Sequence, residues 1–161
     1  MTLGGRLKYL ITLTALALAM PAFGDDAPAL GNFRGLALSS ATARHPLTVR
    51  GGTPVACEVP EGSTLDLKKC KVQDASLVVT GPEENALNVT FEKVNVLRSE
   101  GKYAGWHYYY KGTANLTIGG KPVVAPVFAT LNLDDTNPNR LFGVIELTDQ
   151  YAKTTIEAYR E

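Results

Sequence analysis

From Phe33 onward, apolar and polar residues alternate with a period of two, which predicts β-strands and not helices. The clearest stretch runs from Trp106 to Ile118. One set of alternate positions carries Trp106, Tyr108, Tyr110, Gly112, Ala114, Leu116 and Ile118. The other set carries His107, Tyr109, Lys111, Thr113, Asn115 and Thr117. One face of this expected strand is therefore directed to the core, and the opposite face is directed to solvent.

A glycine pair follows this strand and predicts a tight hairpin. Gly119 and Gly120 supply the positive φ angles that a two-residue reversal requires. Pro126 interrupts the returning strand, and proline cannot donate a ladder hydrogen bond, so part of that strand is expected at a sheet edge or a bulge. The apolar parity of the returning strand carries Val123, Ala125, Val127, Ala129, Leu131 and Leu133.

Further alternation predicts strands on both sides of this hairpin. Leu87, Val89 and Phe91 lie on one parity, whereas Val94 and Val96 lie on the other, so a bulge is expected near residues 92–93. A polar loop is expected over residues 134–139, and a short helix around Tyr151 is an alternative to a strand. Other strands are expected at residues 47–50, 55–59, 65–72, 77–80, 141–147 and 154–159.

These segments define the expected fold class as all-β. Their number, about eight, and their short connections are typical of an antiparallel sandwich or an up-and-down barrel. A chain of 161 residues is natural for a single domain and is long enough to bury a core. We therefore expect one all-β domain with one disulfide.

The first 24 residues have the features of an export signal. Arg6 and Lys8 precede an uncharged apolar run over residues 9–20, and residues 22–24 offer small side chains for cleavage. The run is shorter than the roughly 20 residues that a membrane-spanning helix needs. We expect a signal peptide over 1–24, a flexible arm over 25–32 and the all-β domain over 33–161, located in the periplasm or outside the cell.

Export changes the interpretation of the two cysteines, Cys57 and Cys70. In an oxidising compartment two cysteines usually pair, whereas in the cytosol a metal site or a nucleophile would be considered. The pair encloses a turn sequence at residues 60–63. We therefore expect a disulfide that joins neighbouring strands.

The charge balance narrows the range of partners. The chain has 16 basic and 16 acidic side chains, and loss of the signal leaves 14 basic and 16 acidic ones, a net charge of −2. Nucleic-acid binding needs a concentrated basic surface. We therefore expect a protein or glycan partner outside the cytoplasm, no nucleic acid and no membrane span.

An aromatic cluster between residues 103 and 110 supplies the candidate binding residues: Tyr103, Trp106, His107 and Tyr109. Strand alternation directs His107 and Tyr109 away from the core. Tyrosine and tryptophan provide large contact areas at low entropic cost, which is favourable at protein interfaces and on sugar-binding platforms. The alternative is that tyrosines simply fit the pleated surface of a strand.

Small residues at inner positions leave two interpretations open. They allow close packing against the large aromatic residues, or they leave room for a ligand. In the second case a lipocalin-like barrel would carry a small apolar molecule, with Trp106, Tyr108 and Tyr110 lining its mouth. The small inner residues are Gly112, Ala114, Ala125, Ala129 and Gly143.

Catalytic and metal-binding patterns are scarce. A calcium-loop spacing occurs after residue 134, but Arg140 stands where such a loop needs glycine. His45 and His107 are the only histidines, and His45, next to Pro46, is expected in a loop. We expect no cofactor, no metal and no catalytic residue, although a small secreted hydrolase remains a second alternative because the fold could unite distant side chains. The residues with calcium-loop spacing are Asp135, Asn137, Asn139 and Glu146.

The sequence therefore predicts an exported, non-catalytic binding module. Its partner, a protein or a surface glycan, would meet an outward aromatic strand face or an open sheet edge. The alternative is a carrier of a small apolar ligand. A closed barrel with a pocket would favour the carrier, whereas a sandwich with free edges would favour the partner-binding module.

Overall fold

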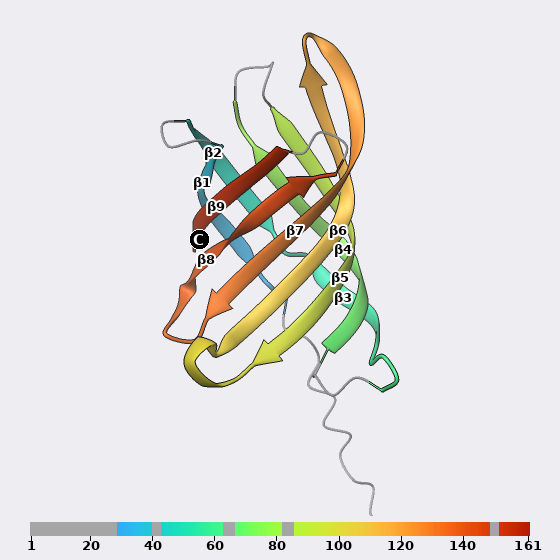
Figure 1. Cartoon of the computed structure of the whole chain (residues 1–161), viewed down its shortest axis with the longest axis vertical. Helices are drawn as coiled ribbons and strands as arrows, with labels where there is room; N and C mark the ends of the chain where they lie inside the picture. The colour runs from blue at the N-terminus through green and yellow to red at the C-terminus, as the bar shows by residue number, and fades with distance from the viewer. Residues whose placement is uncertain (1–28, 40–42, 63–66, 82–85, 149–151) are drawn as a thin grey trace, which may run out of the picture.

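The computed structural model describes residues 29–39, 43–62, 67–81, 86–148 and 152–161, which form an antiparallel all-β fold (Figure 1). The signal peptide expected over residues 1–24 and the helix alternative around Tyr151 lie outside the described residues. The 3₁₀ turn η2 (Gly101–Tyr103) connects β5 to β6. The strands are β1 (Asn32–Leu38), β2 (Arg44–Arg50), β3 (Thr53–Glu58), β4 (Leu67–Val79), β5 (Leu87–Ser99), β6 (Gly105–Ile118), β7 (Lys121–Asp134), β8 (Asn137–Leu147) and β9 (Ala152–Arg160).

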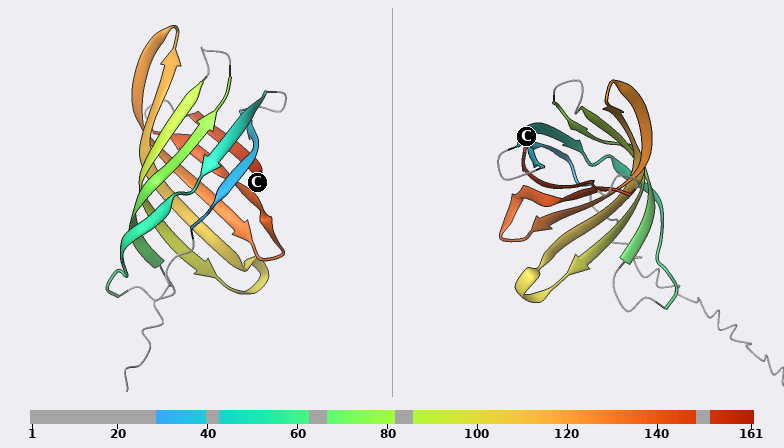
Figure 2. Two further views of the ribbon diagram at one scale, coloured as in Figure 1. Left: turned by 180° about the vertical axis from the view of Figure 1, so that it is seen from behind. Right: turned by 45° about the horizontal axis from the view of Figure 1, so that its top comes forward.

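Eight of the nine strands close into a barrel. Strands β4 to β9 pair consecutively, β9 pairs with β1, β1 pairs with β2, and β2 returns to pair with β4. Every pairing is antiparallel, and Figure 2 shows the strands wrapping around a common interior. Of the two architectures expected, the fold is the barrel.

The ninth strand, β3, lies outside the closed ring. One edge of β4 is divided between β2, which pairs with residues 76–79, and β3, which pairs with residues 69–73. The chain passes from β2 to β3 through Gly51 and Gly52. Gly52 has a φ of +67°, and a side chain there would collide with the backbone of β4. Glycine is therefore required where the chain leaves the ring.

Large aromatic side chains fill the middle of the barrel. Tyr108 and Tyr110 are the largest fully buried residues, and the Phe91 ring packs on Tyr110 with the centroids 4.7 Å apart. The Tyr110 hydroxyl donates a hydrogen bond of 2.8 Å to the carbonyl oxygen of Gly51. Burial raises the pKa of Tyr110 and raises the pKa of Tyr108 to about 12. Both phenols are therefore neutral core groups at physiological pH.

The main strand predictions are confirmed. Gly119 and Gly120 have φ angles of +56° and +77° and reverse β6 into β7. The register of β5 shifts at residues 91–93, where a bulge was expected. Pro126 immediately precedes Val127, which is the first residue of β7 that pairs with β8. The first part of β7 is therefore paired only with β6, which a proline tolerates.

Three segments differ from the predictions. Residues 65–72 and 77–80 read as two strands, but β4 is continuous because a bulge around Asp74, with a φ of +56°, keeps both parts in one ladder. The alternation does not predict β1, whose inner positions include Gly35 and Ala37 and give little hydrophobic contrast. The polar loop expected over 134–139 is a tight turn of two residues, 135 and 136, between β7 and β8.

The described chain packs on the barrel from Leu30 onward. Leu30 is fully buried, and Asn32 already begins β1. The carbonyl oxygen of Gly31 accepts a hydrogen bond of 2.8 Å from the backbone N–H of Gly51. Residues 30–32 of the predicted arm therefore belong to the folded domain, anchored at the bend between β2 and β3.

The predicted disulfide joins Cys57 of β3 to Cys70 of β4. Since β3 pairs only with β4, the bridge fixes the strand that the barrel does not enclose. A loop of this length stabilises a fold by about 3 kcal/mol in the chain-entropy model. Such a bond is typical of an oxidising, extracytoplasmic compartment. The described residues include no helix that is long and apolar enough to cross a membrane.

The hydrogen bond from Tyr110 to Gly51 generates a first prediction. Tyr110→Phe keeps the ring but leaves a buried carbonyl oxygen without a donor, so we expect a loss of about 1–3 kcal/mol in unfolding free energy. Tyr109→Phe is the matched control, because Tyr109 is 40% exposed. Urea unfolding measures both. Equal stability of the two variants would contradict the importance of this hydrogen bond.

Candidate functional site

A pocket of about 440 Å³ opens where the β6–β7 hairpin projects from the barrel, called here the hairpin end (Figure 1). Each apolar residue that lines it stands at or near the end of its strand that faces this opening. The pocket is therefore the mouth of the barrel and not a groove on its outer wall. Its apolar lining includes Ala37, Val79, Leu87, Leu116 and Leu147.

Buried aliphatic side chains close the mouth from inside. Leu47, Leu77 and Val89 lie two residues deeper along β2, β4 and β5, and each is at most 2% exposed. Interiors of eight-stranded barrels are just wide enough to be filled by side chains or to hold one small ligand. This barrel combines both arrangements, because it is filled in the middle and open at the hairpin end.

Four polar residues line the same pocket: Ser39, His45, Thr117 and Thr154. His45 is the one imidazole among them. The sequence predicts it in a loop, but it lies in β2 on the inner parity, beside Ala37 of β1. Pro46 does not end the strand, and its carbonyl oxygen accepts a hydrogen bond of 2.8 Å from the N–H of Thr80. His45 is thus a residue of the mouth that sequence reasoning missed.

The four predicted binding residues do not form one surface. Tyr109 lies on the outer wall at 40% exposure, and Tyr103 lies in η2 at 75% exposure. His107 is on the outer wall but half-buried. Trp106 is directed inward and packs partly buried against the core, with the Arg98 guanidinium 5.5 Å from its ring centroid.

Trp106, Tyr108 and Tyr110, which the carrier interpretation placed at the mouth, do not line it. Tyr108 and Tyr110 are each 1% exposed, so they are packed within the barrel. Trp106 lies opposite Leu133, near the β7–β8 turn at the end away from the hairpin. Aliphatic residues line the mouth instead, because the wide aromatic rings occupy the other part of the interior.

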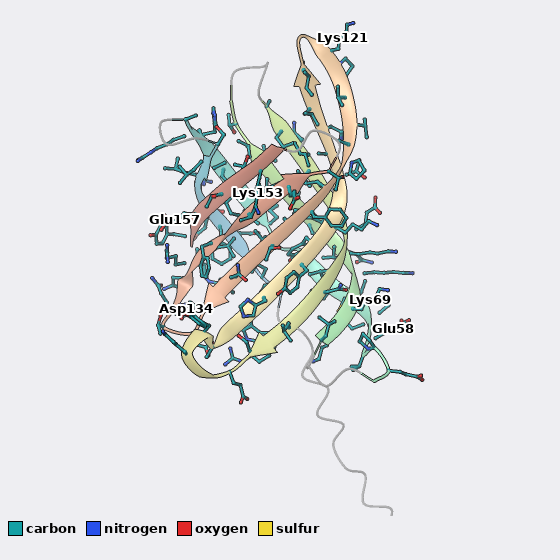
Figure 3. All side chains as sticks on the ribbon, viewed as in Figure 1. Glu58, Lys69, Lys121, Asp134, Lys153 and Glu157 are labelled. Carbon is teal, nitrogen blue, oxygen red and sulfur yellow. A yellow bond between two sulfur atoms is a disulfide. The ribbon has the colours of Figure 1, made fainter. Side chains whose placement is uncertain are left out.

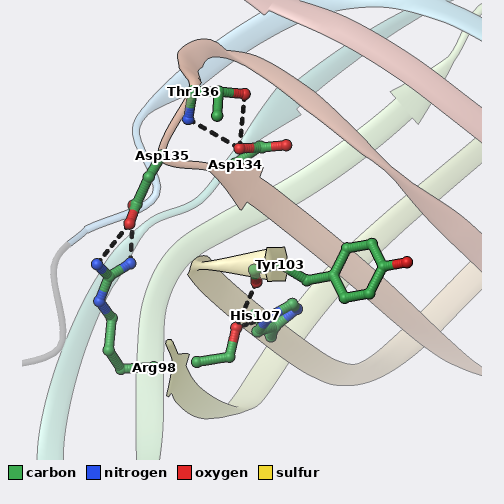
Figure 4. Close-up of polar contacts among 7 residues, drawn as sticks. Arg98, Tyr103, His107, Asp134, Asp135 and Thr136 are labelled. Carbon is green, nitrogen blue, oxygen red and sulfur yellow. Dashed lines mark hydrogen bonds and ion pairs between the residues drawn. The ribbon is translucent and has the colours of Figure 1, made fainter. Parts of the chain in front are cut away.

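His107, which Figure 4 shows beside Tyr103, joins neighbouring strands through a serine–histidine–asparagine arrangement. Its Nε2 atom is 2.6 Å from Oγ of Ser99 on β5, and its Nδ1 atom is 2.6 Å from Oδ1 of Asn132 on β7. The Ser99 hydroxyl donates a 2.7 Å hydrogen bond to the carbonyl oxygen of Tyr103. Asn132 donates in turn to the carbonyl oxygen of Phe142 on β8, at 3.3 Å. The order of the three side chains is that of a hydrolytic triad.

The surroundings of this arrangement favour a structural role. The proton that a nucleophilic serine would give to histidine is donated by Ser99 to a backbone carbonyl oxygen. A hydrolase also needs a cavity for its substrate beside the nucleophile and donors for an oxyanion. The main pockets in the described part of the chain do not reach Ser99, His107 or Asn132. We therefore interpret the three residues as a clamp between β5, β6 and β7.

The residues with calcium-loop spacing do not converge on one point, and the first of them, Asp135, pairs with an arginine. Arg98 donates two hydrogen bonds to the Asp135 carboxylate, at 2.7 and 2.6 Å, and this contact lowers the pKa of Asp135 (Figure 4). Hydrogen bonds from the backbone N–H and the hydroxyl of Thr136 lower the pKa of Asp134. Glu146 lies on the outer wall of β8, away from this turn. Within the described ranges, no three His, Cys, Asp or Glu side chains converge as metal ligands.

Comparisons with known proteins identify no family for this chain. No family model matches it, and neither a curated protein nor a solved structure does. A functional proposal therefore depends on the geometry of the barrel mouth and of the outer wall.

The clamp generates a second prediction. His107→Ala leaves Ser99 and Asn132 without a shared partner, so we expect a loss of about 1–3 kcal/mol in unfolding free energy. Tyr109→Ala removes a half-exposed ring, and we expect a change within about 0.5 kcal/mol. Denaturant unfolding distinguishes the two. A fluorophosphonate probe should leave Ser99 unlabelled, and labelling that disappears in Ser99→Ala would show a nucleophile and overturn the structural interpretation.

Proposed function

We propose that the protein is an exported, non-catalytic binding protein that holds one small, mostly apolar ligand in the mouth of its barrel. The observation that carries this proposal is the apolar pocket of about 440 Å³ at the hairpin end of a closed barrel. Ligand sites in proteins are typically apolar pockets of about 300–1,000 Å³ with a few polar groups, and barrel mouths are a common place for them.

The lining supports a ligand with an apolar body and one polar group. Leu87, Leu116 and Leu147 offer aliphatic contact, and no Asp, Glu, Lys or Arg stands among the described residues of the lining. A ligand with several charges would lose hydration without finding partners there. A single hydroxyl or carboxylate has hydrogen-bonding groups available at His45 and Thr154.

Export remains part of this proposal. Its support is the charged and then apolar start of the chain, residues 1–24, together with the Cys57–Cys70 disulfide. A carrier that works outside the cytoplasm meets apolar molecules in water, where a closed barrel with an apolar mouth has an advantage over an open sheet.

The third prediction tests the mouth by filling it. Thr154 is half-buried and faces the pocket, whereas its neighbour Thr155 is exposed on the outer wall of the same strand. We expect Thr154→Phe to weaken binding of 1-anilinonaphthalene-8-sulfonate, an aromatic probe with one anionic group, by about tenfold or more, equivalent to 1.4 kcal/mol. Thr155→Phe should bind the probe like the unaltered protein. Fluorescence titration measures both affinities.

Two outcomes would contradict this function. One is the absence of saturable probe binding to the unaltered protein, and the other is an equal effect of the two phenylalanine variants. Thermal melts of both variants control for folding. If Thr154→Phe fails to fold, Leu116→Trp fills the same pocket from the inner face of β6 and replaces it in the test.

A second candidate function is recognition of a macromolecule by the outer wall. It is favoured by the half-exposed rings of Tyr109 and Phe128, which are 40% and 42% exposed on adjacent strands. Isolated apolar side chains on a surface are ordinary, but aromatic rings grouped on one face are typical of interaction sites. An open sheet edge is a weaker basis, because β3 is short and contains Pro54.

A further inference from the structure

A row of lysines crosses the outer wall on three adjacent strands. Lys71 of β4 pairs directly with Lys93 of β5, and Lys93 pairs with Lys111 of β6. Lys69 lies two residues from Lys71 on the same face of β4, and all four side chains are exposed. We call Lys69, Lys71, Lys93 and Lys111 the basic face. Figure 3 shows Lys69 on this wall, with Glu58 nearby.

Acidic side chains border the basic face but form no ion pair with it among the described residues. The ion pairs among the described residues all use arginines elsewhere in the barrel. The nearest acids along the ladders are Glu58, opposite Lys69, and Glu92, at the β5 bulge. Neither of them forms an ion pair with the basic face within the described part of the chain. The Lys111 ammonium instead lies 5.7 Å from the centroid of the Phe128 ring.

This arrangement is unfavourable for folding. Like charges directly opposite each other on neighbouring strands repel and destabilise a sheet. Two such pairs share Lys93. Because adjacent strands are about 4.8 Å apart, the side chains of these paired lysines start close to one another on the outer wall. Surface positions tolerate many polar residues, so the stability of the barrel does not require lysine at all three positions.

Aromatic residues lie beside these charges in a shallow groove. The groove has a volume of about 350 Å³ and is lined by Tyr109, Phe128, Lys69, Lys93 and Lys111. Flat rings that are partly exposed offer a surface for the apolar faces of sugar rings, and ammonium groups attract carboxylates or sulfates. The groove therefore combines contacts for a sugar ring with contacts for an anion.

We propose that the basic face and its groove bind an acidic polysaccharide. This inference rests on the second candidate function and names the chemistry of its partner. Protein interfaces are depleted of lysine at their centres and enriched in arginine, whereas this surface has lysines at its centre and no arginine in its groove. Strands β4, β5 and β6 are paired on both sides at this level, so a peptide cannot bind by strand addition.

The fourth prediction measures binding to polygalacturonate, which carries one carboxylate per sugar, with uncharged dextran as the negative probe. We expect Lys71→Gln, Lys93→Gln and Lys111→Gln together to weaken binding by about tenfold or more at low salt. The control replaces Lys102, Lys121 and Lys153 by glutamine, which removes the same charge elsewhere, and should bind like the unaltered protein. The salt dependence of binding should be weaker in the basic-face variant than in the unaltered protein, because fewer counterions are released on binding.

Folding and the mouth site are controlled separately. The basic-face variant should melt at the same temperature as the unaltered protein or higher, because repulsion between Lys71, Lys93 and Lys111 is removed. It should also bind the anilinonaphthalene probe normally, so failure of this proposal is distinguishable from failure of the mouth site. If the triple variant does not fold, Lys93→Gln alone is measured.

Three results would overturn the proposal. The first is no binding of polygalacturonate, and the second is an equal loss in the control triple variant. The third is tighter binding of polyglutamate or of duplex DNA than of polygalacturonate, which would assign the basic face to an acidic protein or to a nucleic acid.

Discussion

The architecture depends on closing the barrel between β2 and β4. This seam has four residue pairs, from Leu47 with Val79 to Arg50 with Ser76. The chain must leave the ring immediately afterwards, and Gly51 and Gly52 make that bend. The Tyr110 hydroxyl donates to the Gly51 carbonyl oxygen from the opposite wall, so the bend is held by the interior of the barrel itself.

Closure determines where binding can occur. It pairs the ring strands on both sides except at the start of β7, so the main remaining surfaces are the two ends and the outer wall. Aromatic rings fill the interior around Tyr108 and Tyr110 and leave the hairpin end lined by aliphatic and small residues. The outer wall in turn presents side chains from adjacent strands in fixed rows, and this places Lys71, Lys93 and Lys111 next to one another.

Local features were predictable from the sequence because alternation, glycine pairs and cysteines act over a few residues. The two faces of β6, the hairpin at Gly119 and Gly120, and the disulfide illustrate this. The seam was not predictable, because it depends on the register between two strands that are not consecutive in the chain. The lysine row depends on the register shifts at the bulges of β4 and β5, and the inward position of His45 depends on β2 continuing through Pro46, so alternation alone predicts neither. The net charge even concealed the lysine row, since it sums over the whole surface.

The central claim is that the hairpin end holds a small apolar ligand. The most direct test is titration of the ¹⁵N-labelled protein with decanoate, followed by backbone amide chemical shifts. The account predicts saturable shift changes near the mouth, at residues such as Ala37, Leu87 and Leu116, and none near Trp106 or Tyr109. Shift changes centred on Trp106 or Tyr109, or no saturable change at all, would contradict it.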